Sequence, residues 1–349
     1  MRTYVNRRFI AAAFFILCLV STNAEAALNT AAIETFGRPS PETGPTQVEV
    51  AIGLLDIDNI NSATQTFYAN VFVGLTWKDT RLAHAGSGSI KYSLHTIWTP
   101  TLQIANEGGL IRKTFPEVAK IEPDGTVRYR QRYVGLFSQT MKLHDFPFDQ
   151  HTFRLHFVAP GYTSKQVRFI PNKEFAARGT PYSSAIQKDI SLPDWEILDY
   201  KTKNSPFILF KDTESAGYAF EFTAKRLVEY YLLKVIMPLV LIVMMSWVVF
   251  WIDPANSGTQ IGVAATSMLT LIAYRFAVDT HVPKVPYFTR LDEFIFMSTL
   301  LVFIALSQVV FTSMLAQCDK GDTARRVDKI SRIVFPVIFF TSACLVLLR

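Results

Sequence analysis

The pattern of hydrophobic and polar residues changes once along the chain, after Arg226. Before that residue, short segments alternate apolar and polar positions and are separated by turn residues, as half-buried β-strands do. The clearest of these segments are residues 66–77, 126–139, 151–158 and 217–224. Residues 45–226 are therefore predicted to form an all-β domain, most simply a sandwich.

After residue 226 come four apolar segments, at residues 230–251, 261–278, 294–315 and 330–348. Each approaches the length of about 20 residues that an α-helix needs to cross a bilayer. Pro238 and Pro336 lie inside two of them, which membrane helices tolerate when neighbours satisfy the freed backbone groups. Residues 227–349 are predicted to be a transmembrane domain, so the chain is a multidomain membrane protein.

The N-terminus has the features of a secretory signal. Arg2, Arg7 and Arg8 precede an apolar run at residues 9–20, and Ala24-Glu25-Ala26 matches a cleavage site. We predict a signal peptide at residues 1–26 and a loose leader at 27–44. An uncleaved anchor is the alternative, although the apolar run is short for spanning a bilayer.

Cleavage of the signal would place the sandwich outside the cytoplasm, so the segment at residues 317–332 would be cytoplasmic. That segment carries Lys320, Arg325, Arg326, Lys329 and Arg332 against Asp319, Asp322 and Asp328. The excess of basic residues fits the positive-inside rule.

Half of the residues are hydrophobic and the formal net charge is +6. Much of the positive charge lies in the signal and in the cytoplasmic segment, and no motif for nucleic-acid binding is present. The three cysteines, Cys18, Cys318 and Cys344, all lie outside the predicted sandwich. That domain is therefore expected to fold without disulfides, and we predict no metal or other cofactor.

The second apolar segment carries a graded stripe. Six of its residues are spaced by three or four positions, which places them on one face of a helix: Gly262, Thr266, Leu269, Ala273, Phe276 and Thr280. Around a symmetry axis they would line a pore, with Leu269 and Phe276 as hydrophobic gates. An ordinary packing stripe is the alternative.

Several motifs together resemble the pentameric ligand-gated ion channels, or Cys-loop receptor superfamily, in particular its prokaryotic, GLIC-type branch. In order they are WKDTRL at 77–82, IWTP at 97–100, PDGTVRY at 123–129, FPFD at 146–149, KRLVEYYLLKVIMP at 225–238, HVPKVPY at 281–287 and RIVFP at 332–336. The resemblance covers nearly all of the mature chain. It implies an extracellular immunoglobulin-like sandwich on a four-helix bundle, a homopentamer surrounded by lipid, and the bacterial inner (plasma) membrane as its location.

The resemblance also implies how the two domains communicate. Asp149 and Arg226 would form a buried ion pair, with Asp56 or Asp58 as a third member. Phe146, Pro147 and Phe148 would press on the loop that contains Pro283 and Pro286. The positions of the signature cysteines hold Gln139 and Phe153, a loss that is common in prokaryotic members.

In the family, the agonist binds in an aromatic box between subunits. Phe72 matches one position of that box, while Ala105 and Pro160 stand where two other aromatics are usual. Tyr162, Phe207, Phe210 and Tyr218 are further candidates for ligand binding, and we expect Trp77, Trp98 and Trp195 to serve the core. Protons are the alternative agonist, although Gln65 and Leu271 replace the glutamate and the pore histidine of the GLIC type.

Ion selectivity is expected to depend on the two ends of the pore helix. Cation channels of the family usually place a glutamate at the cytoplasmic end of the pore helix, where this chain has Thr259 and Gln260. Asp253 and Asp279 lie below and above the helix. We expect a preference for cations, with anions as the alternative because Arg275 could offset Asp279.

Three functions compete on the sequence alone. A ligand-gated channel explains both the ordered motifs and the graded stripe. A membrane-tethered periplasmic sensor that does not conduct would explain the missing box aromatics. A membrane-bound hydrolase is disfavoured because no recognisable catalytic motif is present, so we expect no enzyme.

Overall fold

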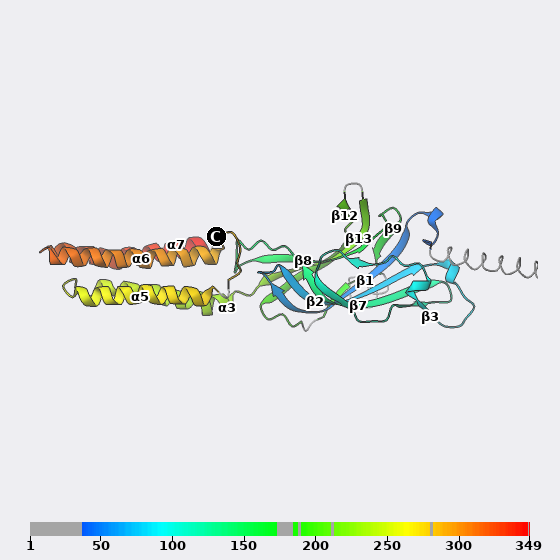
Figure 1. Cartoon of the computed structure of the whole chain (residues 1–349), viewed down its shortest axis with the longest axis horizontal. Coiled ribbons are helices and arrows are strands. Elements are labelled where there is room, and N and C mark those ends of the chain that lie inside the picture. Colours follow the sequence, from blue (N-terminus) through cyan, green and yellow to red (C-terminus); the bar gives the residue numbers. More distant parts are fainter. Residues whose placement is uncertain (1–36, 173–183, 188–189, 211–212, 280–281, 348) are drawn as a thin grey trace, which may run out of the picture.

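The structure is a computed structural model that describes residues 37–172, 184–187, 190–210, 213–279, 282–347 and 349. A β-sandwich is followed along the long axis of the molecule by a bundle of helices (Figure 1). The predicted signal peptide, the leader up to residue 36 and Thr280 lie outside the described residues.

The larger sheet has the strand order β10-β1-β2-β7-β6-β3, and β5 and β9 pair with β7 and β1. Its strands are β1 (Thr46–Asn61), β2 (Thr66–Lys78), β3 (Ile90–Ser93), β5 (Glu107–Lys113), β6 (Val118–Ile121), β7 (Thr126–Ser138), β9 (Val167–Pro171) and β10 (Ser184–Ile186). Short 3-10 helices lie beside them: η1 (Pro41–Thr43), η2 (Thr80–Leu82) and η3 (Leu94–Thr96).

The second sheet has the order β11-β13-β8-β4, with β12 paired to β13. Its strands are β4 (Gln103–Ile104), β8 (Gln150–Ala159), β11 (Trp195–Asn204), β12 (Phe207–Phe210) and β13 (Thr213–Arg226). The four strands predicted from alternation thus appear as β2, β7, β8 and β13, with ends shifted by a few residues at most.

Aromatic side chains fill the space between the two sheets. Phe67 of β2 stacks on Phe137 of β7, and Phe153 of β8 stacks on Phe222 of β13, with ring centroids 5.4 and 5.1 Å apart. These four side chains are at most 1% exposed, because every second residue of each strand faces inward. The turn between β6 and β7 uses Gly125 at φ +80°, a conformation that favours glycine.

The first membrane segment is a continuous helical stretch of mixed type. It comprises α3 (Glu229–Tyr231), a π-helical turn η4 (Leu232–Ile236), α4 (Met237–Val248) and a 3-10 turn η5 (Val249–Trp251). Pro238 at the start of α4 has no N–H to donate to the preceding turn, which is a common cause of such irregularity.

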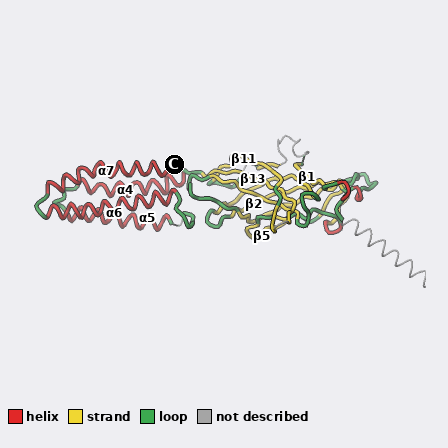
Figure 2. Tube along the Cα trace, turned by 90° about the horizontal axis from the view of Figure 1, so that it is seen from above, coloured by secondary structure: helices red, strands yellow, loops and turns green. Residues whose placement is uncertain are grey.

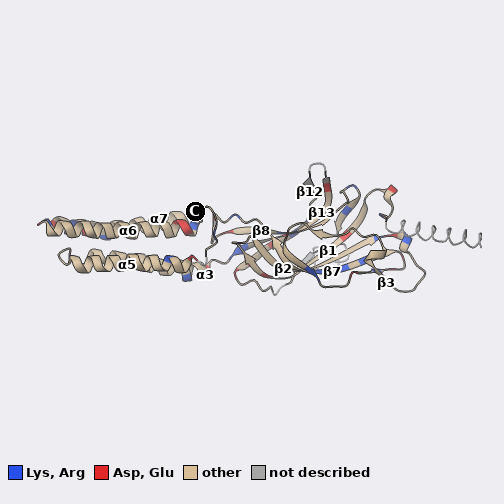
Figure 3. Ribbon diagram, viewed as in Figure 1, with Lys and Arg blue, Asp and Glu red and all other residues tan. Residues whose placement is uncertain are grey.

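Three long helices complete the bundle: α5 (Ser257–Val278), α6 (Arg290–Gln317) and α7 (Gly321–Leu347). With the first segment, they make four helical stretches that are long and apolar enough to cross a membrane. Figure 2 shows α4, α5, α6 and α7 side by side, and Figure 3 shows few charged residues along their length. The four predicted spans are therefore present as helices.

Two helices begin earlier than hydropathy predicted. α6 begins at Arg290, where Thr289 and Asp292 form a capping box. α7 begins at Gly321, so most of the segment expected as a cytoplasmic loop is helical. Its first turns are polar, and a hydropathy pattern detects only the apolar part of a helix.

Candidate functional site

Arg226 and Asp149 form a buried ion pair where the sandwich meets the helices. Nε and Nη2 of Arg226 lie 2.8 and 3.0 Å from Oδ1 and Oδ2 of Asp149. The two side chains are 6% and 2% exposed. Antiparallel pairing of β13 with β8 brings the end of one strand beside the start of the other. The bidentate geometry offsets part of the cost of burying two charges.

Ser62 and His151 complete this cluster. Nη2 of Arg226 donates a hydrogen bond of 2.9 Å to Oγ of Ser62. Nε2 of His151 lies 2.8 Å from Oδ2 of Asp149. Both carboxylate oxygens of Asp149 therefore have partners, and the resemblance named neither Ser62 nor His151.

Asp56 and Asp58, the expected third members, are not partners of Arg226. Oδ1 of Asp56 accepts hydrogen bonds from the backbone N of Ile57 and Ser191, at 2.9 and 2.8 Å. Asp58 is exposed on β1. The prediction was wrong because β1 is irregular here, with register shifts against β2 on both sides of these residues.

The surroundings of Asp149 keep it charged. Burial raises the pKa of its carboxyl, but hydrogen bonds from His151 and Arg226 lower it more, so the pKa lies at about 2. The guanidinium of Arg226 also lies 4.2 and 4.8 Å from the ring centroids of Trp195 and Phe146, so both rings pack against it.

A second contact joins the loop before β8 to the segment that leads into α6. The rings of His144 and Tyr287 stack at 4.1 Å, and the hydroxyl of Tyr287 accepts a hydrogen bond of 3.0 Å from the backbone N of Leu143. Arg290 pairs with Asp145 at 2.7 Å. The domains are therefore joined by polar and aromatic contacts that the sequence did not indicate.

Phe146 lies between the domains and contacts the first membrane segment and the start of α6, whereas its expected contact with the loop of Pro283 and Pro286 stays a prediction. Its ring makes an edge contact with Tyr231 at 4.9 Å, and its backbone O accepts a hydrogen bond of 3.2 Å from N of Leu291. The other predicted coupling residues differ in burial: Pro147 and Pro283 are buried, Phe148 is half-buried and Pro286 is exposed.

The predicted pore stripe lies on the side of α5 that its own subunit leaves uncovered. Gly262, Thr266, Leu269, Ala273 and Phe276 are all exposed, with Leu269 and Phe276 at 68% and 75%. The opposite side of the helix is buried against the bundle through Gln260, Ala264, Ser267, Leu271 and Val278. The five described stripe residues thus share one free face.

Gln260 does not belong to that face. Its side chain is 0% exposed, and Nε2 donates to the backbone O of Val249 and Ile252 and to Oδ2 of Asp328, at 3.1, 3.0 and 3.1 Å. Because it precedes Gly262 by two residues, it lies on the far side of the helix. Its expected role in ion selection was wrong, whereas Thr259 is exposed.

The acidic residues expected at the ends of the pore helix are exposed and paired. Oδ2 of Asp253 lies 3.6 Å from Nε of Arg325, and Oδ2 of Asp279 lies 3.9 Å from Nζ of Lys284. Asp279 therefore pairs with Lys284, where spacing had suggested Arg275. Both carboxylates keep much of their surface in contact with solvent, at 48% and 68% exposed.

Tyr218 is a residue of the core. It is 1% exposed and its ring lies 6.3 Å from that of Phe169. It shares the inner face of β13 with Phe220 and Phe222, since they are two residues apart. The proposal of Tyr218 as a ligand contact was wrong, while Trp77, Trp98 and Trp195 are buried as expected.

Phe72 and Phe207 are the half-buried aromatic candidates on the two sheets. Phe72 faces outward on β2 and lies beside Gly53 and Gly74, where an added Cβ would be in ordinary van der Waals contact with its side chain, at 3.7 and 3.6 Å. Phe207 lies on β12, 5.7 Å from the ring of His156. The side chain of Phe210 lies outside the described residues.

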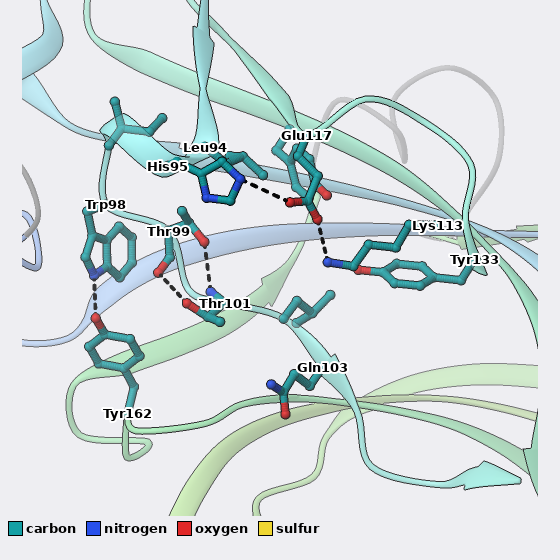
Figure 4. Close-up of a pocket in the computed structure, with 13 residues that line it drawn as sticks. Leu94, His95, Trp98, Thr99, Thr101, Gln103, Lys113, Glu117, Tyr133 and Tyr162 are labelled. Atoms are coloured by element: carbon teal, nitrogen blue, oxygen red, sulfur yellow. Dashed lines mark hydrogen bonds and ion pairs between the residues drawn. The ribbon is translucent and has the colours of Figure 1, made fainter. Parts of the chain in front are cut away.

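Tyr162 lines a pocket of about 420 Å³ in the sandwich (Figure 4). Its hydroxyl accepts a hydrogen bond of 2.9 Å from Nε1 of Trp98, and the two rings meet edge to face at 5.8 Å. Gln103 and Tyr133 also line it, and burial raises the pKa of Tyr133. The pocket therefore has aromatic walls with polar groups between them.

A charged group stands at one side of this pocket. Glu117 lies 2.6 Å from Nζ of Lys113 and 3.8 Å from Nε2 of His95. The hydrogen bond from Lys113 lowers the pKa of Glu117. A carboxylate beside aromatic rings suits a small cationic or hydroxylated ligand.

Two family models match the chain. The model for the neurotransmitter-gated ion-channel ligand binding domain covers residues 32–227, and that for the neurotransmitter-gated ion-channel transmembrane region covers residues 235–323. The chain belongs to the neurotransmitter-gated ion-channel family. The two models follow the division into sandwich and helices seen in the structure.

The family is one of ligand-gated ion channels and not of enzymes, which excludes the hydrolase. The chain is also similar to a proton-gated ion channel of Gloeobacter violaceus, with 24% identity over 300 residues, or 84% of this chain and 80% of that protein. The predicted family and architecture are confirmed, and the chain is a multi-pass membrane protein.

Proposed function

We propose that five copies of this chain assemble around an axis and that α5 of each copy lines the conducting pore. The observation that carries the proposal is the free face of α5. It holds Gly262, Thr266, Leu269, Ala273 and Phe276, and the subunit's own bundle does not cover it.

The composition of this face favours water over lipid. The exposed residues of α6 and α7 include large apolar side chains such as Phe303, Phe311 and Ile333, as a lipid-facing surface requires. α5 instead exposes mainly small and hydroxylated residues in its lower half, with Ile261 as a large apolar residue at 37% exposed. The hydroxyl of Thr266 donates to the backbone O of Gly262 at 2.7 Å and keeps acceptor capacity for water.

The same face supplies two hydrophobic constrictions. Leu269 and Phe276 are its large apolar residues, and both project away from the subunit. Symmetric rings of these side chains would close the pore by excluding water. We propose Leu269 as the main gate and Phe276 as a second one.

Opening is proposed to begin at the subunit interfaces of the sandwich. Phe72 and Phe207 lie on different sheets of one subunit, and we propose that they meet across neighbouring copies and bind a small agonist. The pocket at Trp98 and Tyr162 is a second candidate position for a ligand. The similarity to a proton-gated channel makes protons the first agonist to test.

The proposed transmission runs through the junction of Asp149 and Arg226, because these residues join the strands to the first membrane helix. The sandwich is proposed to face the extracytoplasmic side of the bacterial inner membrane. We propose a preference for cations, supported by the exposed carboxylates of Asp253 and Asp279; anion preference is the alternative.

Reconstitution of the purified protein in planar bilayers tests the proposal. Unitary currents should appear on steps of pH or on addition of small amines or carboxylates. A confirmed pentamer that stays silent under all these conditions would favour the alternative of a non-conducting membrane-tethered sensor.

A further inference from the structure

A buried polar cluster lies behind the lower end of the pore helix. Nε2 of Gln260 reaches three acceptors: the backbone O of Val249 at 3.1 Å, that of Ile252 at 3.0 Å and Oδ2 of Asp328 at 3.1 Å. Gln260 and Asp328 are 0% and 1% exposed. One side chain of α5 thus holds the end of the first membrane segment and α7 together.

Asp328 is held by amides from two helices. Besides Gln260 of α5, Nε2 of Gln308 on α6 lies 3.3 Å from Oδ1 of Asp328. Arg332, one turn further along α7, donates a hydrogen bond of 3.0 Å to the backbone O of Phe250. Every helical segment of the bundle therefore contributes to this cluster.

The three acceptor oxygens around Nε2 fix the orientation of the Gln260 amide. Its Oε1 is buried and has no hydrogen-bond partner among the described residues. Turning the amide over would direct this oxygen at three other oxygens, which is unfavourable. Asp328 is therefore the residue of α7 that accepts a hydrogen bond from the Gln260 amide.

The location of this contact relates it to the pore. Gln260 directly follows Thr259 and precedes Gly262 by two residues, and both of these are exposed on α5. A shift of the Gln260 side chain would move these residues with the helix. α7 packs on α6, α4 and η5. The hydrogen bond between Asp328 and Gln260 connects α7 directly to α5.

We propose that Gln260 and Asp328 are positioning residues that fix the cytoplasmic end of the pore helix, so that α7 helps to set the width of the lower pore. This inference rests on the proposed pore-lining role of α5. It assigns functional roles to two residues that face neither the pore nor a ligand.

The test uses a spin label at the lower pore of the full-length protein in liposomes. Exposed Cys318 and Cys344 are replaced by Ser, and Thr259→Cys carries the label. Labels on neighbouring subunits should broaden the spectrum of the parent through dipolar coupling. Asp328→Asn, which keeps the shape but leaves one acceptor oxygen for the amides of Gln260 and Gln308, should reduce this broadening and increase label mobility.

Two controls separate positioning from general loosening. Asp322→Asn removes a carboxylate that is 93% exposed on the same helix and should leave the spectrum unchanged. A label at exposed Phe296 of α6, twelve residues from Gln308, should keep its spectrum in the Asp328→Asn protein. If Asp328→Asn prevents assembly, Gln260→Met, of similar length but without hydrogen bonds, replaces it.

The outcomes distinguish the two proposals. A broadened parent spectrum that neither Asp328→Asn nor Gln260→Met changes would overturn the positioning role alone. A pentameric parent without broadening at Thr259 would overturn the pore arrangement, and the positioning role with it.

Discussion

Arg226 and Asp149 are 77 residues apart in the chain, yet they share two hydrogen bonds of 2.8 and 3.0 Å at the boundary between the domains. Strand pairing brings them together, and Ser62, His151 and the ring of Trp195 surround them. Because both side chains are buried, water cannot replace either charged group as the partner of the other.

Asp149→Ala should therefore be strongly destabilising. It leaves the guanidinium of Arg226 buried without its partner, at a cost of about 3 to 5 kcal/mol. We expect a large fall in the melting temperature of the detergent-solubilised protein, or no recoverable pentamer. The double variant Asp149→Ala, Arg226→Ala should be less damaged than Asp149→Ala.

The exposed pair of Lys78 and Asp124 is the matched control, with side chains 50% and 62% exposed. Asp124→Ala should leave the melting temperature nearly unchanged. Equal effects of Asp124→Ala and Asp149→Ala would contradict the importance of the buried pair.

The pH dependence of this pair follows from the pKa of Asp149, about 2 in the folded protein. Because this value is below the ordinary one near 4, the pair stabilises fully above about pH 4 and loses its effect as the pH falls toward 2. The difference in melting temperature between wild type and Asp149→Asn should not decrease from about pH 7 to about pH 4 and should shrink below it. A difference that vanished already near pH 6 would show that another group controls the junction.

The junction also shows what the sequence could predict. Asp149 and Arg226 were found because they lie in motifs with a fixed order. Ser62 and His151 belong to no such motif, and they reach the pair only through the packing of β1, β2 and β8. The stacking of His144 on Tyr287 depends on a contact between domains, which no local pattern encodes.

The pore helix provides the next prediction. Leu269→Ala should ease opening, since a smaller apolar ring excludes water less readily. The agonist concentration or pH of half-activation should shift toward weaker stimuli, or the channel should open spontaneously. Met268→Ala is the control, because Met268 is half-buried and lies about 100° around the helix from Leu269. A harder opening of the Leu269→Ala channel would argue against Leu269 as the gate.

The proposed cation preference is tested at both ends of the same helix. Asp253→Asn together with Asp279→Asn should shift the reversal potential under a salt gradient toward lower cation permeability. Asp319→Asn, an exposed carboxylate between α6 and α7, should not shift it. If the double variant keeps the wild-type reversal potential, these carboxylates do not select the ion.

Two wrong assignments had a signal in the sequence that was not used. Gln260 is two residues from Gly262, so helical geometry already placed it on the opposite side. Tyr218 alternates with small residues and shares its face with Phe220 and Phe222, which is the pattern of a core position. The early start of α7 had no such signal, because its first turns are polar and resemble a loop.

The central claim, that α5 lines the pore, is tested most directly by two adjacent residues. Thr266 is exposed on the stripe and Ser267 is 0% exposed against the bundle. In the Cys318→Ser, Cys344→Ser background, unitary currents are recorded from Thr266→Cys and Ser267→Cys channels while a charged thiol reagent is applied. The account predicts that the reagent blocks the Thr266→Cys channel and spares the Ser267→Cys channel. Block of Ser267→Cys without block of Thr266→Cys would contradict it.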